Sequence, residues 1–210
     1  QAINLNGSST VQFIHNGSQL GSDERVITTV TAPTVTNGMV SPRMVSASDV
    51  QFVTYNGNTG FTIAGFDLVQ AGATLGTTVT APANRTLFSG NVVLNAGVDF
   101  ETYALRLDGN VTLGTTSDNT AQIILGSGGL ISNGTRSITA GVVAGSIATP
   151  TDLYLYNNGT TTFGDFANPN TAAQILATSI VKFGAGTLQF LGNNAGFTGD
   201  IRIQQGAVTL

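Results

Sequence analysis

The chain has 210 residues, of which 41% are hydrophobic and only 9% are charged, and its formal net charge is −4. Its six arginines and one lysine are scattered, which excludes the basic stripe that nucleic acid requires, and no apolar run reaches the roughly 18 residues of a membrane helix. The absence of cysteine excludes disulfides and cysteine-ligated metals. We therefore expect neither nucleic-acid binding nor membrane insertion by this segment.

The composition favours strands and turns over helices. Thr, Val, Asn and Gly are abundant, whereas the strong helix formers Lys and Glu are represented only by Lys182, Glu24 and Glu101. β-branched residues fit a pleated sheet, and Gly and Asn supply turns. The composition predicts an all-β protein.

Along the first third of the chain a regular pattern is followed by an irregular one. Residues 1–20 alternate apolar and polar side chains and contain two Asn-Gly turns. The alternation weakens over 21–60, where Pro33 and Pro42 cannot donate to a central strand ladder. We expect this segment to leave a regular coil as an excursion.

Short apolar runs separated by Gly, Asn and Asp continue from residue 61 to the end. Phe100 and Leu105 have opposite parity, so a bulge or corner near Thr102 is needed to place both on one face. Residues 171–178 are long enough for two helical turns, but a further strand fits the surrounding pattern better.

The C-terminal stretch, Val181–Leu210, shows the unit most clearly. Its apolar residues are spaced by two and bounded by glycine turns, at Val181/Phe183, Leu188/Phe190, Ile201/Ile203 and Val208/Leu210. Such a unit cannot bury its apolar face without similar units above and below it. We predict one domain over 1–210, a single-stranded right-handed parallel β-helix with roughly eight to ten coils of roughly 20 to 25 residues.

Two acids are the only candidates for catalysis. Asp99 and Glu101 are separated by one residue, so on a strand both project from one face together with Tyr103. Carboxylates about 7 Å apart beside a phenol could act as acid and base on a glycan. The alternative, which we favour, is a solvated outer face.

Other motifs indicate no cofactor and no metal. His15 is the only histidine and precedes an Asn-Gly turn, so we expect a surface turn residue. The glycine-rich pieces 126–129 and 184–186 lack a following helix and are expected to form corners rather than phosphate sites. Thr-x-Thr pairs such as Thr78/Thr80 are irregularly spaced, which disfavours an ice-binding ladder.

The C-terminal stretch also has a family resemblance. The run KFGAGTLQFLGNNAGFTG at Lys182–Gly199, followed by G-x-x-x-L at Gly206–Leu210, resembles the autotransporter-associated β-strand repeat. A weaker likeness in layout extends over 105–155. The resemblance implies a secreted bacterial right-handed β-helix that serves adhesion, aggregation or display, and it carries no catalytic residues.

Together these observations predict a structural or interaction module of a bacterial cell-surface or secreted protein. Its expected partners are further copies or repeats stacked end to end, surface glycans or neighbouring cells. The alternative is a carbohydrate-active β-helix enzyme of the lyase or tailspike kind, with Asp99 and Glu101 as its weak catalytic candidates. Because the apolar pattern is still running at Ile3 and Leu210, we also expect a piece of a longer repeat protein or a self-stacking chain.

Overall fold

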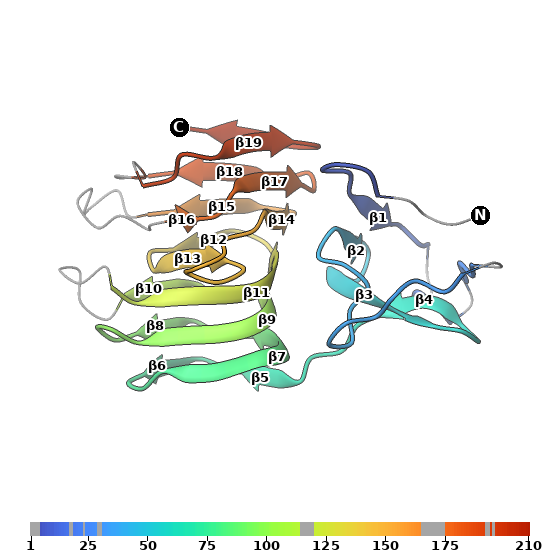
Figure 1. Cartoon of the computed structure of the whole chain (residues 1–210), viewed down its shortest axis with the longest axis horizontal. Helices are drawn as coiled ribbons and strands as arrows, with labels where there is room; N and C mark the ends of the chain where they lie inside the picture. The colour runs from blue at the N-terminus through green and yellow to red at the C-terminus, as the bar shows by residue number, and fades with distance from the viewer. Residues whose placement is uncertain are drawn as a thin grey trace. The chain divides into compact units, whose positions relative to one another are not determined.

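The computed structural model describes residues 5–16, 19–22, 24–28, 31–113, 120–164, 175–191, 194 and 196–210. All regular structure in these ranges is β-strand, without a helix (Figure 1), which confirms the predicted all-β class. The chain divides into two compact units, Gln1–Gly65 (unit 1) and Phe66–Leu210 (unit 2).

Unit 1 is a small four-stranded sheet. Its strands follow one another in the order β1 (Val11–Phe13), β2 (Met44–Ser46), β3 (Gln51–Asn56) and β4 (Gly60–Ile63). β1 pairs with β2 in parallel, but β2, β3 and β4 pair antiparallel through short turns. Unit 1 therefore does not belong to the single coil predicted for the whole chain. Tight hairpins connect its strands in place of the crossovers that parallel coils require.

Unit 2 is a parallel β-solenoid. Its strands are β5 (Leu68–Gln70), β6 (Ala73–Leu75), β7 (Val79–Phe88), β8 (Val92–Leu94), β9 (Asp99–Leu107), β10 (Val111–Leu113), β11 (Gln122–Ser132), β12 (Arg136–Ile138), β13 (Gly141–Ala144), β14 (Leu153–Asn157), β15 (Thr160–Phe163), β16 (Ile175–Leu176), β17 (Ser179–Phe183), β18 (Thr187–Phe190), β19 (Asp200–Ile203) and β20 (Ala207–Thr209). In the described part of the chain these strands pair with one another in parallel, so the predicted parallel coil is confirmed for this unit.

The strands form three faces. The first face contains the opening halves of β7, β9 and β11 together with β13 and β16. The second face runs from β5 to β19 and includes the closing halves of the three long strands, and the third face runs from β6 to β20. Within the described residues, the first turn, β5–β6, and the last, β19–β20, contribute to the second and third faces alone.

The solenoid has about five turns rather than the eight to ten predicted. The chain before Phe66 lies in unit 1 and adds none. The turns also vary in length, because Leu68 pairs with Thr86, whereas Leu155 pairs with Lys182, which is a longer step along the chain.

The predicted corner near Thr102 is confirmed by the strand register. Thr102 belongs to the first face and Ala104 to the second, with only Tyr103 between them, whereas β7 and β11 have a longer corner at the same place. This break in alternation turns Phe100 and Leu105 toward the same interior.

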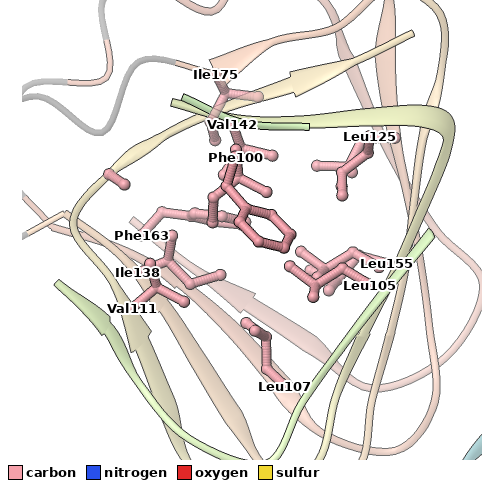
Figure 2. Close-up of a cluster of buried hydrophobic side chains, with 14 of the residues drawn as sticks. Phe100, Leu105, Leu107, Val111, Leu125, Ile138, Val142, Leu155, Phe163 and Ile175 are labelled. Carbon is pink, nitrogen blue, oxygen red and sulfur yellow. The ribbon is translucent and has the colours of Figure 1, made fainter. Parts of the chain in front are cut away.

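The interior is filled by inward-pointing side chains from all three faces. Figure 2 shows Phe100, Leu125, Val142 and Ile175 from the first face converging with side chains of the other two, namely Leu105, Leu107, Leu155, Val111, Ile138 and Phe163. Aromatic rings meet between successive turns, with the centroids of Phe88 and Phe100 4.7 Å apart in an edge-to-face arrangement. Apolar stacking therefore continues from turn to turn along the unit.

Candidate functional site

Asp99 and Glu101 lie on the outer side of the first-face half of β9, as their spacing predicts, and Tyr103 lies at the corner that follows. All three are partly exposed, and they alternate with the buried Phe100 and Thr102. The residues beside Glu101 on the adjoining turns are Thr80 and Ile124, and the backbone N–H of Asp99 donates to Thr78 Oγ1 at 3.2 Å. Glu101 is therefore flanked by a hydroxyl and an aliphatic side chain, and Asp99 by Thr78 and Gln122, rather than by further acids.

His15 is not the surface turn residue that the sequence predicts. Its side chain is only 7% exposed, and its Nε2 lies 2.8 Å from Asp49 Oδ2 in unit 1. Ser46 Oγ donates to the same carboxylate oxygen at 2.6 Å. Because this serine bonds the acid instead of the imidazole, the three residues do not form a nucleophile–base pair. No local spacing indicated this contact, since His15 and Asp49 are far apart in the sequence.

Unit 1 also contains an open cavity of about 370 Å³. Apolar side chains dominate its described walls, with hydroxyls at Thr28, Thr31, Thr34 and Ser41. None of the described residues that line it carries a charge. In the part of the chain that the structure describes, no group of three or more His, Cys, Asp or Glu side chains is placed to hold a metal ion.

The most distinctive surface of unit 2 is the edge formed by β19 and β20, at the C-terminal end of the solenoid (Figure 1). Each strand pairs with one neighbour, β17 for β19 and β18 for β20. Their inward column continues the core, yet Ile203 is 51% exposed and Leu210 is 93% exposed. The edge thus presents both unpaired strand groups and apolar side chains.

A recess of about 300 Å³ opens beside this edge. It is lined by Phe190, Asn194, Phe197, Ile201 and Leu210. The Asn194 side-chain oxygen is buried there without a hydrogen-bond partner in the described structure. The recess resembles the cross-section of a solenoid, because most of its lining side chains are apolar and one buried oxygen lacks a hydrogen-bond donor.

Lys182 lies inside the solenoid just below the same edge. It occupies the inward column after Leu155, and its side chain is fully buried. Its Nζ donates to the carbonyl oxygens of Gly184 at 2.7 Å and Gln205 at 2.9 Å. Burial lowers the pKa of Lys182 to about 8, because the interior disfavours the charged ammonium. The lysine therefore links the β17–β18 turn to the β19–β20 turn.

This orientation corrects the apolar pattern of the C-terminal stretch at one of its four pairs, Val181/Phe183. Val181 and Phe183 were expected on the core side, but Ile180 and Lys182 occupy it, in register with Leu153 and Leu155. The alternation of Val, Lys and Phe favoured the opposite assignment because lysine is rarely buried.

Glycines form a column at the corner between the second and third faces. A Cβ on Gly109, Gly159 or Gly186 would lie 2.0 to 2.4 Å from backbone atoms of the corner one turn earlier. Successive corners therefore approach more closely than any side chain allows, which explains why glycine turns recur along the sequence. The same relation holds between Gly206 and Gly186, at 2.2 Å.

Asparagine side chains stack beside these glycines. The Asn91 side-chain oxygen accepts from Asn110 N–H at 2.9 Å, and Asn158 Nδ2 donates to Asn133 Oδ1 at 3.0 Å. The corner thus uses its side-chain amides to join successive turns.

The described residues contain no helix with the length and hydrophobicity needed to cross a membrane. Comparisons with protein-family models, with curated proteins and with solved structures give no match.

Proposed function

We propose that this protein is a structural and interaction module, a β-solenoid whose β19–β20 edge is extended by another solenoid turn. The observation that carries the proposal is the edge itself, where Ile203 and Leu210 expose apolar surface in continuation of the core. A further turn laid on this edge would pair with β19 and β20 and cover the recess beside Phe190. Burial of this surface, at about 25 cal/mol per Å², favours such an addition.

The geometry supports a non-enzymatic role. Asp99 and Glu101 share one outer strand face, with Thr80 and Ile124 beside Glu101 on the adjoining turns. Acid and base catalysis on a glycan needs carboxyls that converge on one bond from two sides. We therefore propose a rod for display, adhesion or association in place of the alternative lyase or hydrolase.

We propose the cellular location of the protein on the same grounds. The resemblance of Lys182–Leu210 to the autotransporter-associated β-strand repeat supports a bacterial cell-surface or secreted protein. Surface glycans and neighbouring cells are the partners that such a location makes available. A glycan array with the purified chain tests this part directly.

The test of the edge is to add one further turn to it. Thr187 pairs with Ala207 in the last complete step of the third face, and the segment 191–210 has the same length as that step. A second copy of 191–210 joined after Leu210 therefore continues the register. We expect the lengthened chain to melt at least about 2 °C higher and to protect the amides of β19 and β20 from hydrogen exchange.

The matched control carries valine at the corner glycine of the added segment. A Cβ at that position would collide with the carbonyl of Gly206. In the same way, a Cβ built on Gly206 would lie 2.2 Å from the carbonyl oxygen of Gly186. The control should lose the gain in melting temperature and in protection. An added turn that leaves the β19 and β20 amides unprotected in both versions would contradict the proposed function.

A further inference from the structure

Two buried side-chain oxygens inside unit 2 have no hydrogen-bond partner among the residues that the structure describes. They are Ser132 Oγ and Asn157 Oδ1, and both residues are fully buried. An orphaned polar atom in a protein interior costs free energy, so buried polar groups are almost always satisfied by protein or by ordered water. Each of these oxygens therefore needs a hydrogen-bond partner.

The two side chains lie next to each other in one inward column. Ser132 pairs with Leu107 on the preceding turn and with Asn157 on the following one. Figure 2 shows Leu107 pointing into the interior, and residues in register on parallel strands share a side of their sheet. Neighbouring strands are about 4.8 Å apart. The Ser132 and Asn157 side chains therefore lie side by side inside the solenoid, at a spacing that a small molecule can bridge.

The hydrogen bonds of the Asn157 side chain fix the orientation of its amide group. Nδ2 donates to the carbonyl oxygen of Thr187 on the following turn at 2.8 Å and to that of Gly159 in its own turn at 3.1 Å. Exchanging the nitrogen and the oxygen would place Oδ1 against two carbonyl oxygens, which cannot donate. Oδ1 therefore lies on the other edge of the amide, away from the following turn, and Ser132 belongs to the preceding turn.

The surroundings of these oxygens suit a water molecule. Because serine is shorter than the leucine one turn earlier, the column is less completely filled at this level. A buried water needs about two to four polar partners, and Ser132 Oγ can donate to a water that donates to Asn157 Oδ1. A metal cation is disfavoured, since neither oxygen is charged and the Lys182 ammonium extends from the neighbouring inward position, in register with Leu155.

We propose that unit 2 holds an internal water molecule that bridges Ser132 Oγ and Asn157 Oδ1. With this bridge, polar contacts join successive turns from within, as the strand ladders join them along the sheets. Asn157 continues the contacts to Thr187 on the next turn, and Lys182 continues them to Gln205 on the last. The site lies in the interior of unit 2, so it does not depend on the proposed function of the β19–β20 edge.

A high-resolution crystal structure of the full chain tests the site directly. We expect a density peak within about 3.2 Å of both Ser132 Oγ and Asn157 Oδ1, as for a hydrogen-bonded water. A direct hydrogen bond between the two side chains would overturn the proposal, and so would a map without a peak between them. A peak at about 2.3 Å from both oxygens would also overturn it, because that distance indicates a metal ion.

Magnetic relaxation dispersion of the water signal counts long-lived internal waters in solution. Ser132→Leu, which repeats the leucine of the preceding turn, should lower this count by about one relative to the unmodified chain. Ser137→Leu is the matched control and should leave the count unchanged, because Ser137 alternates with the inward Ile138 and lies on the outer side of β12. Equal counts for the unmodified chain and a folded Ser132→Leu would refute the internal water. The crystal structure needs no substitution, so the proposal stays testable even where Ser132→Leu does not fold.

Discussion

The ammonium of Lys182 donates to the backbone carbonyl of Gln205 across two successive turns, at 2.9 Å. A second bond to Gly184, at 2.7 Å, holds the same group against the corner of its own turn. The last turn of the solenoid is thus joined to the one before it by a buried charge as well as by the strand ladder.

Lys182→Met is expected to weaken the last turn. Methionine fills a similar volume but leaves the carbonyls of Gly184 and Gln205 without their donor, at a cost of about 1–3 kcal/mol in the free energy of unfolding. Hydrogen exchange should be faster at Gln204, whose N–H donates to the carbonyl of Lys182 at 2.8 Å. Unchanged exchange at Gln204 would show that the lysine does not hold this turn.

The same lysine gives stability a defined alkaline pH dependence. Its pKa is lowered from 10.5 to about 8 in the folded protein, so between these values the unfolded chain binds more protons. The free energy of unfolding contributed by Lys182 therefore rises with pH from about 8 to about 10.5, by roughly 3 kcal/mol at most. The stability difference between the unmodified chain and Lys182→Met, measured over this alkaline range and at neutral pH, should shift by this amount in favour of lysine. A difference that stays flat with pH would refute the prediction.

Gly186→Ala should destabilise unit 2 far more than Gly76→Ala. An alanine Cβ at position 186 would lie 2.0 Å from the carbonyl oxygen of Gly159, whereas at position 76 the nearest atom is 3.6 Å away, an ordinary contact. We expect a loss of about 2 kcal/mol or more at position 186 and of less than about 0.5 kcal/mol at position 76, by chemical denaturation. Equal losses at the two positions would mean that corner spacing is not what selects glycine.

Asp152 should make unit 2 sensitive to acid. Burial raises the pKa of its carboxyl group, but hydrogen bonds from Thr178, Ser179 and Tyr154 outweigh that effect and leave the pKa below its ordinary 3.8. A lowered acid pKa contributes stability that is present at neutral pH and lost as pH falls through the folded value, below about 4. Asp152→Asn should flatten this loss in a melting series from neutral to strongly acidic pH, and Asp99→Asn on the outer face serves as the control. A series in which Asp152→Asn keeps the full acid loss would exclude this carboxylate as its source.

The solenoid of unit 2 could be predicted from the sequence because its signals are local. Apolar residues spaced by two, glycine turns and the change of parity between Phe100 and Leu105 each follow from a few neighbouring residues. The break in alternation near Thr102 followed from parity alone.

Unit 1 and Lys182 required information that no short pattern carries. β2, β3 and β4 are as short and apolar as solenoid strands, and their antiparallel pairing depends on chain reversals between them. The inward side chain of Lys182 depends on two carbonyl groups, one of which belongs to Gln205 in the following turn. In both cases a tertiary partner overrides the local preference.

The parallel ladders of unit 2 also determine how it should respond to force. Successive turns are joined by backbone hydrogen bonds that lie along the stacking direction. Tension applied along that direction loads the hydrogen bonds of one turn at a time, whereas tension along the strands would load all the bonds of a sheet together. Stretched from its C-terminus, the unit would yield in successive steps of one turn, beginning with the turn that Lys182 holds.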